Sequence, residues 1–561
     1  MRVVPWLILV VVNLYASILL AGRLWWDHAM YWDMTKLYGV FRTNAYSLNH
    51  FGQVAFSDPA GQLSYPLFYF SHLGTNMFTP LGALVLSILY ALGMAGVMVN
   101  DFTRLWIFHI GFLTPLLFSV CGYLLLSQIF QKLSVRIFII IMLAFSPGVI
   151  FNMTDPILEQ SAYGILFAAS FLWFYRKPGV ASFIGLISAS MAGALAVNHL
   201  TLYWSLIFVP LFVGAILCVG VPQERSSGGV AWYWWLCGAA AVALCLMPAM
   251  MTYGMGVDIV RTAAADRWYS FDGITSGNPM EFLTASTPGI GWNWIGGAWS
   301  LQGYGQPIQS GTIAYTYMGV LALPLCFVGL CYGRSPWNTR LTIIIIGFAL
   351  CAALASWSSV FAAVLVWPTP IRACRHYCDC LFRDGFFFVV IFAAALGFDA
   401  VLNGFRRVLG WTILGSIVVS AAILSMIYGT SLLHSPMIGY HLTALVIALT
   451  VGFMRCNARH LALLIILLAF MDTSNVAYGH CRAYMWPRAQ AWKDPAGIVM
   501  PVDERNAYLQ PGNQLLTIKP NSTTNFYPIL HRTEKFYVAG YACLVLTVCM
   551  LCVILANRKS Q

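Results

Sequence analysis

The sequence predicts an all-α protein that crosses a membrane many times, and three observations lead to this fold class. The chain of 561 residues is 60% hydrophobic and only 9% charged, whereas soluble domains carry roughly 25% charged residues. Apolar runs of about 20 residues, the length that spans a bilayer, recur along the whole chain. Lysine and arginine give a formal net charge of +11 but stand singly or in pairs between these runs. This distribution is typical of the loops of a polytopic membrane protein and argues against nucleic acid as a partner.

The apolar runs predict about 14 transmembrane helices. The first run, 3–22, is long enough to span and lacks a small-x-small cleavage site, so we interpret it as a retained helix. The other spans are expected near 105–130, 137–152, 161–175, 179–197, 202–220, 230–254, 316–333, 341–358, 385–402, 409–428, 442–454, 461–472 and 536–556. Residues 1–472 then form one transmembrane domain, 473–535 a small proline-broken cap, and 536–561 a final helix with its tail.

One apolar run, from Pro80 to Val99, is not expected to cross, because the loop charges argue against it. If the N-terminus is cytoplasmic and 80–99 is an interfacial helix on the outer face, the basic residues of the short loops gather on the inner side. These residues are Lys132, Arg136, Arg176, Lys177, Arg225, Arg334, Arg340, Arg406, Arg407, Arg455, Arg459, Arg558 and Lys559. The outer loops 153–160, 198–201 and 429–441 then hold no lysine or arginine, and both termini are cytoplasmic.

The same topology places nearly all acids on the outer side. Of 19 Asp and Glu residues, only Glu224 and Asp399 fall on or near the inner side. Sixteen of the others lie in outer segments, namely 23–104, which should hold interfacial helices, and 153–160, 255–315, 359–384 and 473–535. The remaining one, Asp472, is at the outer end of the expected span 461–472. We therefore expect proton-transfer chemistry on the outer face. Within the spans, His109 and Asp399 are the main ionisable residues, which is few for an ion-coupled transporter.

The first outer loop begins with two acids among aromatic residues, Asp27 and Asp33, in the stretch Arg23-Leu-Trp-Trp-Asp-His-Ala-Met-Tyr-Trp-Asp-Met-Thr-Lys36. Asp27 is expected about five residues beyond the first helix, at headgroup depth, where Trp and Tyr are favoured. Six residues of helix turn through about 600°, so the two carboxylates would not share a face. Each is either a solvated interfacial acid or a base that accepts a proton from an acceptor hydroxyl.

The second outer loop holds Asp155 and Glu159. Asp155-Pro156 is typical of a helix start, with the aspartate capping backbone amides, and this is the simpler interpretation of Asp155. Glu159 lies four residues later, on the same face of such a helix. His199, at the next outer turn, is either an interfacial residue or a substrate contact.

A basic segment, Trp367–Cys380, lies at another outer helix end. Arg372 and Arg375 would suit a lipid phosphate because guanidinium groups bind phosphate in a bidentate manner; headgroup anchoring is the alternative. His376 lies beside them.

The cysteines of this segment do not predict a metal site. Cys374, Cys378 and Cys380 with His376 match no common zinc-ligand spacing. On an oxidising face these cysteines, or Cys481, could form disulfides. The chain also has no P-loop, no dinucleotide-binding glycine motif and no Gly-x-Ser-x-Gly elbow.

The order of these features resembles the GT-C glycosyltransferases over roughly residues 1–400. The stretch from Asp27 to Leu37 is similar to the segment around the catalytic acid of oligosaccharyltransferase catalytic subunits. Ser71-His-Leu-Gly-Thr-Asn76 resembles the GLGTN region of the bacterial YfhO family, and Pro370-Ile-Arg372 resembles that family's Pro-x-Arg segment. The family's acid is often one of an adjacent pair, whereas Asp33 is six residues from Asp27, so the choice between them stays open.

The resemblance implies a sugar transfer on the outer face of a bacterial inner membrane, from a polyprenyl-phosphate donor to a hydroxyl of a glycan or lipid acceptor. It implies a catalytic base at Asp27 or Asp33, further acids at Asp155 and Glu159, and a lipid-phosphate contact at Arg372 and Arg375. We expect His199 and His376 to be further substrate contacts. Whether a divalent metal such as Mg²⁺ or Mn²⁺ takes part is left open.

Two alternatives remain from the sequence. An O-antigen polymerase or ligase would act on the same face, but such enzymes tend to carry their largest outer loop later in the chain. A flippase or other transporter of lipid-linked sugars would need ionisable groups near the bilayer midplane, which are scarce here.

Overall fold

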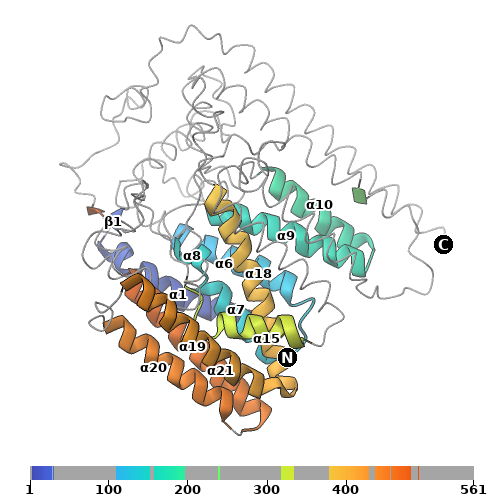
Figure 1. The fold of residues 1–561 in the computed structure, drawn as a ribbon. Helices are drawn as coiled ribbons and strands as arrows, with labels where there is room; N and C mark the ends of the chain where they lie inside the picture. Colours follow the sequence, from blue (N-terminus) through green and yellow to red (C-terminus); the bar gives the residue numbers. More distant parts are fainter. Residues whose placement is uncertain are drawn as a thin grey trace.

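The computed structural model describes residues 3–27, 29–30, 109–151, 157–195, 238–239, 317–333, 378–428, 436–454, 456–481 and 490–491. Within these ranges the protein is helical, apart from one pair of two-residue strands (Figure 1). The helices are α1 (Val4–Asp27), η2 (His109–Leu113), α6 (Thr114–Leu126), α7 (Leu133–Ala144), α8 (Pro147–Phe151), α9 (Ile157–Arg176), α10 (Val180–Leu195), α15 (Ala322–Tyr332), α18 (Cys378–Ala400), η10 (Val401–Phe405), α19 (Arg406–Tyr428), α20 (Pro436–Phe453) and α21 (Ala458–His480). The predicted all-α class is confirmed for this part of the chain.

Three helical stretches among the described residues are long and apolar enough to cross a membrane: Leu133–Ile150, Phe387–Val419 and Ala458–Gly479. The second contains a sharp turn, because Gly404 has φ +116° and separates α18 from α19. The predicted spans at 202–220, 341–358 and 536–556 lie outside the described residues, as do most of 230–254 and the whole run 80–99.

Several helices are longer than the apolar runs that predicted them. α1 continues to Asp27, so this residue ends the helix and does not follow it in a loop, as the sequence had suggested. α21 continues to His480, eight residues beyond the expected end of its span at 472. Hydropathy marks where side chains turn polar, but the backbone keeps its helical hydrogen bonds into the polar region, so the apolar runs underestimate both helices.

Contacts between side chains fix the directions of the helices. The ring centroids of Trp6 and Tyr123 are 4.9 Å apart, and Ser119 Oγ donates a 2.9 Å hydrogen bond to Asn13 Oδ1. α1 and α6 are therefore antiparallel. Tyr15 contacts both Phe145, directly after α7, and Phe470 of α21, so α1, α7 and α21 pack against one another.

Polar contacts then join the helix ends into one surface, which we name the basic end. It consists of residues 127–132, 177–179, 401–405, 454 and 456–457. Arg176 Nη1 donates to the Gln128 carbonyl at 2.7 Å, which brings the ends of α6 and α9 together. Arg406 Nη1 donates to the Cys456 carbonyl at 3.0 Å, which joins the starts of α19 and α21. α6, α9, α15, α18 and α20 end there, and α1, α7, α10, α19 and α21 begin there. These relative directions are the ones that the basic loops predict.

Backbone-to-backbone packing joins α15 and α18. A Cβ at Gly397 would overlap the Leu325 carbonyl oxygen, and a Cβ at Gly329 would overlap the Ala393 carbonyl oxygen. Each helix thus uses a glycine where the other approaches. Small residues at such crossings allow the close packing that stabilises helix pairs in membranes, where lipid is as apolar as a leucine side chain.

We predict that Gly397→Ala destabilises the protein by at least about 2 kcal/mol, because the added methyl group forces α15 and α18 apart. Thermal unfolding in detergent measures the effect. The control is Gly415→Ala in α19, where a Cβ would meet nothing within 4 Å. This variant should be neutral or slightly more stable, since alanine favours a helix by about 1 kcal/mol over glycine. Equal stability of the two variants would contradict the packing role of Gly397.

Candidate functional site

Most residues that the sequence singles out as functional lie outside the described ranges: Asp33, Asp155, His199, Arg372, Arg375 and His376. For Asp27 and Glu159 the structure describes the backbone alone. It therefore places these two residues on their helices.

Asp27 ends α1, where the helix dipole does not favour an acid, although Arg23 lies four residues earlier on the same face of the helix. The last turn of a helix carries a partial negative charge, so a carboxylate at this position is unfavourable by about 0.3–1 kcal/mol. No basic residue lies in the last turn itself, and Arg23 lies one turn before Asp27. Glu159, in contrast, lies in the first turn of α9, where the helix dipole favours an acid. α9 begins at Ile157, directly after Asp155-Pro156, where the sequence predicted a helix start.

Asp27 and Glu159 lie at the same end of the helix bundle, opposite the basic end. α1 begins at the basic end and leads away from it to Asp27, whereas α9 begins near Glu159 and leads to Arg176 at the basic end. Two hydroxyl groups lie near the starts of α6 and α9, at this same end of the bundle. The hydroxyls of Thr114 on α6 and Ser161 on α9 are fully buried, and neither has a hydrogen-bond partner among the described residues. A buried hydroxyl without a partner is unfavourable, so these two groups are available to a ligand or water that reaches them.

A short strand pair links two segments that the sequence had placed on the same face. β1 (Ala29–Met30) directly follows α1, and β2 (Gln490–Ala491) lies beyond α21. They are antiparallel, with Ala29 opposite Ala491 and Met30 opposite Gln490. The chain just after Asp27 therefore lies beside part of the polar segment 473–535.

The most completely bonded buried acid in the described ranges is Asp472, which the sequence did not single out as a site residue. Asp472 is only 2% exposed. It lies on α21, about 21 Å along the helix axis from Ala458, the first residue of that helix. The Tyr317 hydroxyl lies 2.8 Å from both carboxylate oxygens, and the Val320 backbone N–H donates to Oδ2 at 2.8 Å. Gly319 adopts φ +105° between these two donors, and a Cβ there would lie 3.2 Å from Oδ2. Asp472 thus fixes the start of α15 against α21.

The sequence concealed Asp472 because the apolar span was expected to end at that residue, with the next residues belonging to a polar tail. The helical period continues past it, since Leu468, Ala469, Asp472, Val476 and Ala477 are all buried. The available signal was this helical spacing, i, i+1, i+4, i+8 and i+9, with apolar residues at every position but that of Asp472. Asp472 is therefore an ionisable residue in the interior of α21, which the sequence did not count among those of the spans.

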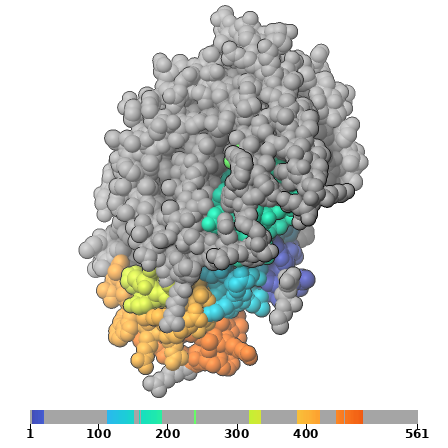
Figure 2. Space-filling model, turned by 90° about the vertical axis from the view of Figure 1, so that its right-hand side faces the viewer, coloured from blue at the N-terminus to red at the C-terminus, as the bar shows by residue number. Residues whose placement is uncertain are grey.

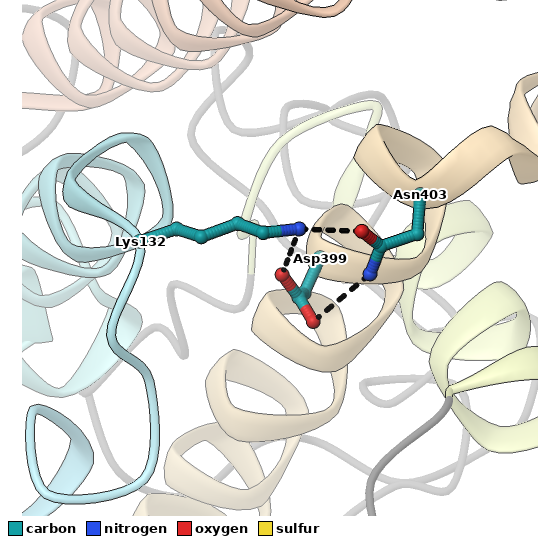
Figure 3. A network of polar contacts seen from close by, with 3 residues as sticks. All are labelled: Lys132, Asp399 and Asn403. Carbon is teal, nitrogen blue, oxygen red and sulfur yellow. Dashed lines mark hydrogen bonds and ion pairs between the residues drawn. The ribbon is translucent and has the colours of Figure 1, made fainter.

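Asp399, the other acid that the sequence placed in a span, lies at the basic end in a polar network (Figure 3). Lys132 Nζ is 2.8 Å from Asp399 Oδ1 and donates to Asn403 Oδ1 at 2.7 Å, while Asn403 Nδ2 lies 3.4 Å from Asp399 Oδ2. The side chains of Lys132 and Asp399 are 43% and 34% exposed. This network joins the α6–α7 connection to the turn at Gly404 and is partly exposed.

Of the cysteines expected as disulfide candidates, the structure describes the side chain of Cys481. This residue, directly after α21, is a free and fully buried thiol. Burial raises its pKa to about 12, so the thiol stays protonated near neutral pH and its reactive thiolate is scarce. The described residues contain no group of three or more His, Cys, Asp or Glu side chains that could hold a metal ion.

Comparison of the chain with protein-family models, curated proteins and solved structures gave no match.

We predict that the contact of Tyr317 with Asp472 stabilises the fold much more than the contact of Lys132 with Asp399. Tyr317→Phe removes a hydroxyl that bonds a buried carboxylate and should cost about 1.5–3 kcal/mol. Asp399→Asn weakens an exposed pair and should cost no more than about 1 kcal/mol. Thermal unfolding of both variants in detergent checks this. If both variants lost stability equally, the anchoring role of Asp472 would be wrong.

Proposed function

We propose that this membrane protein is a GT-C-type glycosyltransferase that moves a sugar from a polyprenyl-phosphate donor to a hydroxyl of a glycan or lipid acceptor. The observation that carries the proposal is the separation of charge between the two ends of the bundle. Lys132, Arg136, Arg176, Arg406, Arg407 and Arg459 lie at one end with a single described acid, Asp399, while Asp27 and Glu159 lie at the opposite end, which holds fewer described cations, Arg23 and Arg383. By the positive-inside rule, the basic end faces the cytoplasm and the acids face outward, where a bacterial inner membrane presents lipid-linked sugars.

The position of Asp27 supports its role as the base. The acid is the last residue of α1, at the end of the bundle opposite the basic end. The pairing of Ala29 with Ala491 brings part of the polar tail beside it, which would cover a site on this face. Asp33 remains the alternative base. Asp155 and Glu159 would be further acids of the same site, and Asp155 could equally serve as a helix cap.

The proposed chemistry is a single displacement at the anomeric carbon. Asp27 takes the proton of the acceptor hydroxyl, whose oxygen forms a bond to that carbon as the bond from carbon to the donor phosphate oxygen breaks. The electron pair of the broken bond leaves with the polyprenyl phosphate, and the anomeric configuration inverts. Such a leaving group needs little acid assistance, so Arg372 and Arg375 need only stabilise its charge, with His199 and His376 as further contacts.

The transporter alternative is favoured by one observation, the buried acid Asp472. Intramembrane acids are typical of transport pathways. Here, however, Tyr317 and Val320 bond both carboxylate oxygens and hold the start of α15, which supports an anchoring role. Movement of the lipid-linked sugar across vesicles that contain no acceptor would favour a flippase over a transferase.

We predict that Asp27→Asn abolishes sugar transfer and leaves membrane insertion intact, because asparagine cannot take the proton. The measurement is mass spectrometry of cell-surface glycans in cells that lack the protein, complemented with each variant. Asp399→Asn, at the basic end, is the matched control and should retain transfer. Full activity of Asp27→Asn would remove this residue from the mechanism.

The paired variant Arg372→Ala with Arg375→Ala should raise the KM for the lipid-linked donor by about tenfold or more, because it removes two charged contacts to phosphate. Initial rates at varied donor concentration measure this. Lys132→Gln, a cation lost from the basic end, should leave KM unchanged. A fall in kcat with an unchanged KM would contradict the phosphate role.

A further inference from the structure

α19 presents one exposed face that changes in character along its length. Arg407, Trp411, Gly415 and Val418 are all exposed and lie three or four residues apart, so they share that face. Trp411 is 64% exposed and Val418 62% exposed. The face thus runs from a cation at the basic end, through an aromatic ring, to an apolar side chain. This order matches the headgroup, interface and hydrocarbon layers of a bilayer leaflet.

α21 repeats the pattern on its own exposed face. Arg459 lies at the basic end, and Leu463, Leu467 and Met471 follow at intervals of four residues. These three apolar side chains are 53%, 48% and 54% exposed. Figure 2 shows the orange part of the chain, which contains α18 to α21, at one end of the space-filling view.

The two arginines that begin these faces are not used by the described part of the protein. Among the described residues, neither Arg407 nor Arg459 makes a side-chain hydrogen bond or an ion pair. The one described acid at this end, Asp399, is paired with Lys132. Arg406 behaves differently, since it bonds the Cys456 carbonyl and thereby holds the starts of α19 and α21 together. Two guanidinium groups therefore stand on adjoining helix starts with no anion of the described ranges to balance them.

The surface beside Arg407 leaves room for a chain. Trp411 packs edge-on against Phe453 of α20, with ring centroids 5.6 Å apart, so its ring is held in place while most of it stays exposed. One turn further, nothing lies within 4 Å of where a Cβ of Gly415 would be. An acyl chain that descends from a headgroup at Arg407 would pass the tryptophan ring and lie over this glycine.

We propose that the exposed faces of α19 and α21 bind anionic phospholipids of the leaflet at the basic end, with the lipid phosphates on Arg407 and Arg459 and the acyl chains on the apolar residues that follow. Charge complementarity selects an anionic lipid, since two unbalanced cations attract a headgroup of net negative charge more strongly than a zwitterionic one. The bidentate fork of arginine adds a preference for phosphate. The inference is independent of the glycosyltransferase proposal, because it uses neither the acids nor the opposite end.

The test is native mass spectrometry of the full-length protein in detergent, with phosphatidylglycerol and phosphatidylcholine of identical acyl chains added in equal amounts. The wild type should retain phosphatidylglycerol in at least about threefold preference. The double variant Arg407→Gln with Arg459→Gln should lose most of that preference. Both side chains are exposed and make no bond to the described residues, so the protein should fold normally, and unchanged thermal unfolding without lipid checks this.

Two controls separate charge from other causes. The double variant Arg407→Lys with Arg459→Lys keeps both charges and should keep most of the preference, whereas Lys132→Gln removes a cation already paired with Asp399 and should have little effect. Added glycerol phosphate, which carries the headgroup chemistry without acyl chains, should not displace the lipid. Equal retention of the two lipids by the wild type, an unchanged preference in the double glutamine variant, or displacement by glycerol phosphate would each overturn the proposal.

Discussion

The free-energy cost of placing a charge in hydrocarbon governs the arrangement of these helices. Lysine and arginine cannot remain inside a bilayer without a large penalty, so helices begin or end where these residues occur. In the described ranges, five helix ends and five helix starts meet at one surface, held by Arg176, Arg406 and Lys132 through bonds to carbonyl, carboxylate and amide oxygens. The directions of the helices follow from that shared surface, and so does the position of Asp27 and Glu159 at the opposite end.

Inside the bundle, the choice of which helices pack together depends on close backbone contacts and on polar contacts more than on apolar burial. Between helices in a membrane, burial alone gives little preference for one partner over another, because lipid offers a similar apolar environment. Gly329 and Gly397 let two backbones touch, and Asn13 with Ser119 forms a buried hydrogen bond between α1 and α6. Asp472 of α21 accepts buried hydrogen bonds from Tyr317 and Val320 at the start of α15. These contacts specify which helices pack together and in which register.

The two ends of the molecule have different chemistry and, in our proposals, different partners. At the basic end, some cations are used within the protein, as in the network of Lys132, Asp399 and Asn403, while Arg407 and Arg459 are left for lipid. At the opposite end, Asp27 is the last residue of α1, and we propose it as the base. A sugar transferred there would meet a base at the depth where a polyprenyl phosphate holds its cargo.

The helical class and the alternation of helix directions could be predicted from the chain alone, because composition and the spacing of lone basic residues reflect the cost of charge in a bilayer. It took the folded structure to show that α1 reaches Asp27, that Asp472 is buried under Tyr317, and that Gly397 meets Leu325. Each of these depends on a partner more than 70 residues away or on backbone hydrogen bonds that continue beyond an apolar run, and hydropathy records neither. The bonding of Asp399 was likewise decided by packing, since a lone acid near a helix end looks the same in the sequence whether or not a lysine from another loop reaches it.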